Sequence, residues 1–369
     1  MICAVAARWR PGAPNEGVHL AQLLGHAQAT ADAALIEHLF STLLLARYNG
    51  LQNAVIDGCA QQLDRPRRLP LLLALFGQHA AARPAACLAL WLTLASRGDA
   101  DPALIDALAI GLVAHLAGCK PDDRRPHYRF EMQTRDDWPN HDSDDDDSDD
   151  DVADLMRFGS NRKQPPAPTL NADLVAAFMI ALGQNGLTAQ QAQAVDGMNA
   201  NVRVFAPESI LLPALEQIAG NAYCDAASTT LWRHCAGHYL ARSETPPRPP
   251  LDWARAADLA DHCIDCRELQ DFARNGQAPT HRFRLREDRR HHLETQILNH
   301  QLDIATSTER KGSPHTLICT KTRASYERAA LQHQKDRTDM ARLLAVTERI
   351  GVADTALSER LRIALATGG

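Results

Sequence analysis

The sequence of 369 residues is poor in aromatic residues, which make up 5% of it, and in lysine, which supplies only five of its 39 basic residues. Its longest apolar runs, residues 69–76 and 86–95, are well below the roughly 18 residues that a membrane span needs. The N-terminus has a short apolar run with no basic region before it, unlike a secretory leader. We therefore predict a cytoplasmic protein without membrane association. The abundance of Arg, Ala and Leu is typical of a GC-rich bacterial genome.

The sequence also lacks the short motifs on which common enzyme classes depend. It contains no Gly-x-Ser-x-Gly elbow, phosphate-binding glycine loop, dinucleotide fingerprint or His-Glu-x-x-His zinc helix. His292-x-Glu294 imitates part of an iron-binding facial triad, but residues two apart lie on different faces of a helix. These absences favour a non-enzymatic protein, and they indicate no nucleotide or organic cofactor.

The acidic residues are unevenly distributed. Residues 142–151 hold eight Asp, and without them the formal net charge of −6 becomes +2 for the rest of the chain. Like-charge repulsion and the scarcity of apolar residues predict an acidic disordered linker over 136–168. A calcium loop is not indicated, because the Gly at the turn and the closing Glu are missing. The nine cysteines are odd in number and mostly isolated, which is typical of a reducing compartment.

Residues 1–135 and 169–242 are predicted to form one helical region that the linker interrupts. Apolar residues recur with a 3.6-residue period, which predicts helices over 29–48, 50–63, 69–80, 84–96, 103–117, 171–184, 188–198 and 209–218. Ser228 is predicted to cap a further helix that runs to Arg242. Segments of this length with short breaks are typical of an irregular HEAT-like helical repeat, and an ordinary helical bundle is the alternative.

The proline-rich residues 245–250 cannot be helical and predict a domain boundary. Beyond them, alternating or β-branched residues predict strands over 281–286, 303–308 and 316–320, with helices over 288–302 and 325–350. This order indicates a small α+β domain over 251–350, with a C-terminal helix or tail over 351–369. The fold class expected is mainly α: the helical-repeat or bundle region, followed by this small domain with a zinc knuckle.

The strongest chemical signal is the pair Cys263 and Cys266. Two thiolates at this spacing can bind one ion, and tetrahedral zinc needs two further ligands. We predict a structural zinc site with His292 and His262 as candidate ligands; Asp261 and Cys235 are alternatives for the fourth position. Incidental thiols and a redox pair are the competing interpretations. A helix is expected to start directly after the motif, and its dipole to lower the pKa of both thiols.

The second candidate site is an arginine cluster next to the first predicted strand. Its members are Arg282, Arg284, Arg286, Arg289 and Arg290. Such a cluster could bind nucleic acid or another polyanion through phosphates, or the chain's own Asp run. The alternative, which we favour, is a solvated face whose arginines pair with Glu287, Asp288 and Glu294. The scarcity of nearby aromatic residues argues against single-stranded nucleic acid.

A spaced series of residues runs through 260–325: Cys263-x-Asp265-Cys266, Leu269, Phe272, Arg289-Arg290-x-His292-Leu293, Gly312-x-Pro314 and the strand 317–321. It resembles the C-terminal region of large proteins related to iron/2-oxoglutarate, prolyl-hydroxylase-like oxygenases. The catalytic barrel of those proteins, with its His-x-Asp…His iron ligands, is absent from this chain. The resemblance therefore implies an accessory, non-catalytic part of such a system, with Cys263, Cys266 and His292 as a site.

These observations lead to one preferred function and two alternatives. The preferred one is a non-enzymatic scaffold or protein-interaction module, with a protein partner and a structural zinc in its C-terminal domain. The first alternative is the accessory oxygenase role, and the second is nucleic-acid binding through the arginine-rich face of residues 281–292.

Overall fold

The computed structural model describes residues 16–121, 167–259, 263–351 and 354–367. It divides into two compact units, residues 1–232 and 233–369, each of which is described by itself. The division lies within a helix rather than at the proline-rich residues 245–250. The predicted acidic linker over 136–168 lies almost wholly outside the described residues.

The first unit consists of helices. They are α2 (Glu16–Thr30), α3 (Ala33–Leu39), α4 (Leu45–Arg47), α5 (Asn53–Gln61), α6 (Arg65–His79), α7 (Pro84–Ala95), α8 (Pro102–Val113), α9 (Ala172–Gln184), α10 (Thr188–Ala200), α11 (Leu212–Ile218) and the start of α12 (Asp225–Ser243). Two π-helical turns, Phe40–Leu44 and Pro207–Leu211, precede α4 and α11.

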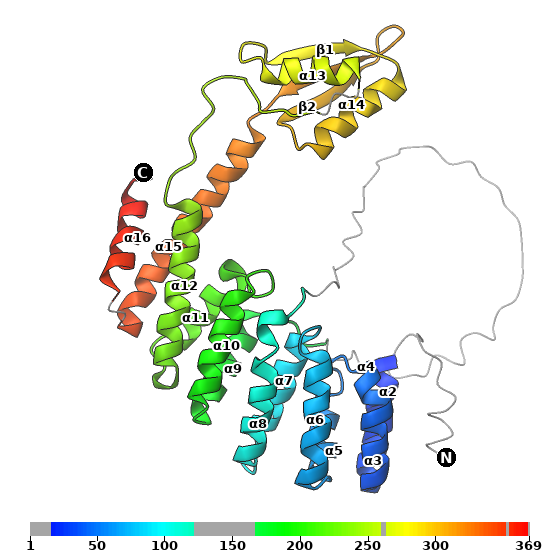
Figure 1. The fold of residues 1–369 in the computed structure, drawn as a ribbon, viewed down its shortest axis with the longest axis vertical. Coiled ribbons are helices and arrows are strands. Elements are labelled where there is room, and N and C mark those ends of the chain that lie inside the picture. Colours follow the sequence, from blue (N-terminus) through cyan, green and yellow to red (C-terminus); the bar gives the residue numbers. More distant parts are fainter. Residues whose placement is uncertain (1–15, 122–166, 260–262, 352–353, 368–369) are drawn as a thin grey trace, which may run out of the picture. The chain divides into compact units, whose positions relative to one another are not determined.

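These helices pack in two rows (Figure 1). In one row α2 contacts α5, α5 contacts α7, α7 contacts α9 and α9 contacts α11; in the other, α6 contacts α8 and α8 contacts α10. Large side chains fill the space between the rows. Trp91 is fully buried, stands edge-on to Phe178 at 5.1 Å between ring centroids, and donates from Nε1 to the Ile105 carbonyl. Trp91 of α7 thus packs against α9 in its own row and α8 in the other.

Side-chain caps mark the start of several helices. The Asp32 and Asn171 side chains accept hydrogen bonds from the Leu35 and Leu174 amides, which caps α3 and α9. Two sequence predictions were wrong in detail. The helix expected over 29–48 is broken at Ala31, whose φ of 51° ends α2. Ser228 is not a cap, because α12 begins at Asp225 and Ser228 is fully buried within it.

The second unit begins with the end of α12 and contains a small sheet. Its further elements are α13 (Ile264–Arg274), β1 (Thr280–Arg284), α14 (Glu287–Asn299), β2 (Ile304–Glu309), β3 (Thr316–Lys321), α15 (Ala324–Ile350) and α16 (Thr355–Thr367). The strands are antiparallel in the order β1-β3-β2, with Phe283 opposite Leu317 and Thr306 opposite Cys319. The expected mainly helical chain with a small sheet near its C-terminus is therefore confirmed.

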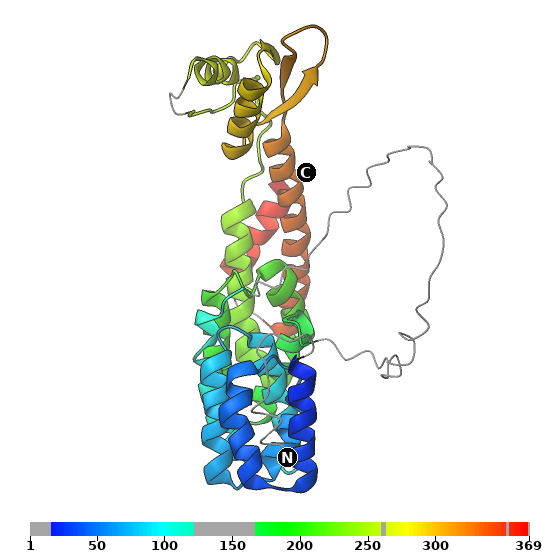
Figure 2. The same cartoon turned by 90° about the vertical axis from the view of Figure 1, so that its right-hand side faces the viewer.

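Helices α13 and α14 cover one face of this sheet (Figure 2). Leu269 and Phe272 from α13 and Leu293 from α14 pack with Phe283 and Leu317 of the strands in one buried cluster. This packing fixes the position of α14 relative to the start of α13, where the cysteine pair lies.

A buried carboxylate joins α12 to α15. Asp336 is fully buried and accepts hydrogen bonds from Arg242 Nε at 2.7 Å and Gln332 Nε2 at 2.9 Å, and also from the Ser243 hydroxyl.

No helix within the described residues is both long and apolar enough to span a membrane.

Candidate metal centre

The two cysteines of the motif lie at the N-terminus of α13. Cys263 is the N-cap, with extended backbone, and its Sγ accepts a hydrogen bond from the Cys266 amide at 3.4 Å. Cys266 lies in the first turn and is buried, whereas Cys263 is half-buried. The helix therefore begins within the motif, and its first turn brings the two thiols to the same side. Their sulfur atoms are 3.4 Å apart, well beyond the length of a disulfide bond.

His292 reaches these sulfurs from α14. Its neighbour Leu293 and Ile297 one turn later are buried in the core, so this helix lies against α13. His292 Nε2 lies 3.1 Å from Cys266 Sγ and 3.7 Å from Cys263 Sγ. The three side chains are the one group of at least three Cys, His, Asp or Glu within the described residues whose ligand atoms lie close enough to share an ion.

The arrangement fits a tetrahedral ion. Zinc–sulfur bonds of about 2.3 Å and zinc–nitrogen bonds of about 2.0 Å place tetrahedral ligand atoms roughly 3.5–3.8 Å apart. The three separations of 3.1, 3.4 and 3.7 Å lie at or slightly below that range. Small side-chain shifts would open them to one face of a tetrahedron. Two thiolates and an imidazole are also a donor set that zinc prefers.

A surface cavity lies beside the cluster. Cys263, Asp265, Asp288, Arg289 and His292 line it. Two of the predicted candidates for the fourth ligand position, His262 and Asp261, lie outside the described residues.

Cys235, the third candidate for the fourth position, is not part of the cluster. It is fully buried on α12, where burial, with a contribution from Asp339 of α15, raises the pKa of its thiol to about 12. Cys235 therefore belongs to the packing of these long helices.

The pKa of the Cys266 thiol is shifted in the direction opposite to the prediction. Burial first, and then the neighbouring Cys263, raise the pKa of the Cys266 thiol to about 11. The expected lowering by the helix dipole was wrong for this residue, because desolvation and a nearby sulfur outweigh a partial charge at a helix end.

A carboxylate–guanidinium pair connects the same two helices. Asp265, between the two cysteines, is buried and accepts hydrogen bonds from Arg289 Nε at 2.6 Å and from Arg289 Nη2. Arg289 lies three residues before His292 on α14, so the pair supports the cluster from one side. Sequence reasoning placed Arg289 in a polyanion-binding cluster and missed this contact, since the two residues are 24 positions apart.

The other arginines of the predicted cluster point to different partners. Arg282 pairs with Glu309, Arg284 donates to the Ser313 carbonyl at 3.2 Å, and Arg290 is buried and donates to the Leu285 carbonyl at 2.8 Å. Arg286 is exposed at the N-cap of α14. Four of the five arginines, those on β1 and α14, thus make internal contacts with different partners.

Comparisons of the chain with protein-family models, with curated proteins and with solved structures found no match.

Proposed function

We propose that Cys263, Cys266 and His292 hold a structural zinc ion in a non-enzymatic scaffold or protein-interaction protein. The observation that carries the proposal is the convergence of the three ligand atoms, within 3.1–3.7 Å of one another, from two helices. A bound zinc would connect the N-terminus of α13 to α14, and the Asp265–Arg289 pair would hold the two helices in register.

A structural role suits the size of this part of the chain. Its core is a single cluster of small extent, formed by α13, α14 and the three strands. Domains with so little apolar material commonly need a metal or disulfides, and zinc binding then contributes directly to the free energy of folding.

The scaffold role rests on the packing of the first unit. Two rows of helices, with successive contacts along α5, α7, α9 and α11 in one and along α6, α8 and α10 in the other, are consistent with an irregular HEAT-like array. Such arrays present extended surfaces to protein partners. The accessory role that the oxygenase resemblance implies would use the same scaffold and the same zinc.

The test is native mass spectrometry of the full chain expressed with zinc. We expect one zinc ion per chain, lost in Cys266→Ser and in His292→Ala. His291→Ala is the matched control, because this exposed histidine is adjacent on the same helix and lies outside the cluster. Wild-type protein without zinc, or equal zinc content in the His292→Ala and His291→Ala variants, would refute the site.

A further inference from the structure

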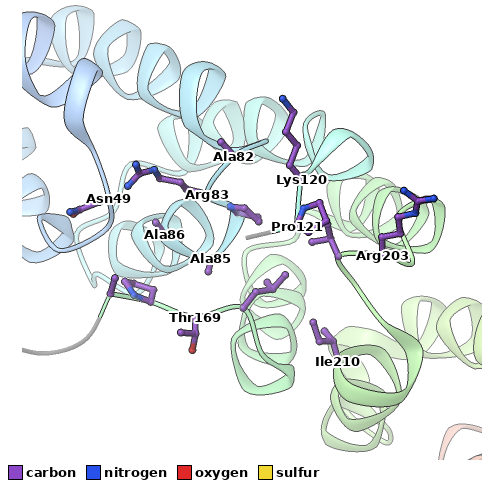
Figure 3. Close-up of a pocket in the computed structure, with 15 residues that line it drawn as sticks. Asn49, Ala82, Arg83, Ala85, Ala86, Lys120, Pro121, Thr169, Arg203 and Ile210 are labelled. Carbon is purple, nitrogen blue, oxygen red and sulfur yellow. The ribbon is translucent and has the colours of Figure 1, made fainter. Parts of the chain in front are cut away.

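The first unit contains a groove of about 300 Å³ with positively charged residues around it (Figure 3). Its walls are the first turn of α7, residues 120–121, residues 167–170 and residues of the segment 203–210. The groove is apolar inside, where Pro84, Ala85, Leu170 and Ile210 line it.

Three cationic residues, Arg83, Lys120 and Arg203, line the groove, and none of its described lining residues is acidic. Figure 3 shows their charged ends pointing in different directions rather than toward one point. Separated charges of one sign fit an extended polyanion better than a single compact anion. The amides of the first turn of α7 have no side-chain cap and add a partial positive charge at the same place.

Hydrogen bonds and close packing hold these walls in place. The Lys120 amide donates to the Ala81 carbonyl at 2.7 Å, and Asn201 Nδ2 donates to the Cys119 carbonyl at 2.8 Å. Gly50 lies so close to Ala86 and Pro168 that an added Cβ would meet them at 2.8 and 3.0 Å. The groove is therefore a built feature of the unit.

The chain segments that form the groove point to a candidate for its occupant. Pro121 and Ala167, which flank the stretch 122–166 outside the described residues, both line the groove. That stretch contains the eight Asp of residues 142–151. The shorter connection, residues 152–166, can span up to about 50 Å when extended, so chain length allows the run to reach the groove. A tethered partner also acts at a high effective concentration.

We infer that the groove lined by Arg83, Lys120 and Arg203 binds the Asp run of residues 142–151 of the same chain. The carboxylates of the run pair with these cationic side chains, chiefly those of Lys120 and Arg203. Because the run is tethered at both ends, it competes with acidic segments of other proteins for the groove. The inference does not depend on the zinc site.

The test measures binding of a fluorescent peptide, DSDDDDSDDD, to full-length chains at low salt by anisotropy. The first chain is the wild type, and the second carries Asn in place of the eight Asp of 142–151. The third adds Lys120→Glu and Arg203→Glu to the second; both side chains are exposed, so the fold should tolerate the change. The matched control adds Arg282→Glu and Arg284→Glu instead, at two exposed positions of β1.

We expect the Asn-substituted chain to bind the peptide at least tenfold more tightly than the wild type, whose own run occupies the groove. Lys120→Glu with Arg203→Glu should reduce this binding at least tenfold, and the β1 control should leave it unchanged. Equal binding by the wild type and the Asn-substituted chain, or no binding by the latter, would overturn the inference. Loss of binding only in the β1 control would place the run on the arginine cluster instead.

A second measurement uses the wild-type chain alone. A carbodiimide joins a lysine amine to a nearby carboxylate. Because the chain has only five lysines, a cross-linked peptide that contains Lys120 can be identified by mass spectrometry. We expect an amide between Lys120 and the Asp run that decreases severalfold in Arg203→Glu. A yield unaffected by Arg203→Glu would show that the cross-link reflects the tether alone, and would overturn the inference.

Discussion

The carboxylate of Asp265 accepts two hydrogen bonds from the guanidinium of Arg289. Asp265 lies between the two cysteines of the cluster, and Arg289 lies one turn before His292. The pair therefore joins the same two helices as the proposed metal, through charge-assisted hydrogen bonds of fixed geometry. Contacts of this kind orient metal ligands and raise affinity without touching the ion.

Loss of this pair should weaken zinc binding. We expect Asp265→Asn to lower the zinc affinity of the full chain roughly 10–100-fold, because Arg289 would no longer hold the start of α13 against α14. Competition with a chelator of known affinity measures the change. Arg286→Ala, at the exposed N-cap of α14, is the control and should have no effect. An unchanged affinity in Asp265→Asn would remove the supporting role of the pair.

Removal of the metal should loosen one part of the second unit. With EDTA we expect faster amide hydrogen exchange in α13 and α14, since these helices would lose the link at the cluster. Helix α15 should stay protected at its Asp336 contacts with α12. Unchanged exchange of α13 and α14 after verified zinc removal would contradict a structural role of the metal.

The buried Asp336 should make the α12–α15 pair sensitive to acid. Burial acts to raise the pKa of Asp336, but hydrogen bonds from Arg242, Ser243 and Gln332 outweigh it and hold the pKa below its usual value. The stabilisation is present above the unfolded-state pKa of about 3.9 and is lost as the pH falls through the lowered folded-state pKa.

Asp336→Asn tests this contact. We expect a loss of roughly 2–3 kcal/mol at pH 7, below the usual cost of breaking a fully buried pair because Arg242 is one-third exposed. Hydrogen exchange of α12 and α15 from pH 7 to pH 3 measures it, and the variant should show a weaker pH dependence. Glu348→Gln, exposed on the same helix, is the control. Equal stability of both variants at pH 7 would refute the contribution of Asp336.

Gly50 should be intolerant of any side chain. Its φ of 90° is unfavourable for other residues, and a Cβ would meet Ala86 at 2.8 Å and Pro168 at 3.0 Å. We expect Gly50→Ala to destabilise the first unit by roughly 2–4 kcal/mol through backbone strain and overpacking. Gly98→Ala has nothing within 4 Å and should be nearly neutral. Urea unfolding of both variants compares them, and similar midpoints would contradict the close packing at Gly50.

Much of the fold could be predicted because its signals are local. The 3.6-residue period located α5 to α11 in the first unit, and alternation with β-branched residues located the strands near Phe283, Ile304 and Leu317. The predictions that were wrong concern features that depend on tertiary contacts. Nothing near Ser228 in the sequence shows that α12 begins three residues earlier or that Ser228 is buried in the folded unit.

The ligands of the candidate site could also be predicted from the sequence, but their surroundings could not. The spacing of Cys263 and Cys266 indicates a metal by itself, and His292 was a reasonable third ligand. The partner of Arg289 could not be inferred, because the expected carboxylates were its sequence neighbours, whereas Asp265 comes from another helix. The raised pKa of Cys266 likewise results from burial, which spacing does not reveal.

The most direct test of the zinc proposal is X-ray absorption at the zinc edge of the full chain loaded with one equivalent of zinc. We expect two sulfur neighbours at about 2.3 Å and nitrogen at about 2.0 Å, with one sulfur lost in Cys263→Ser. A coordination shell without sulfur, or the same shell in wild type and Cys263→Ser, would contradict a zinc site built from Cys263, Cys266 and His292.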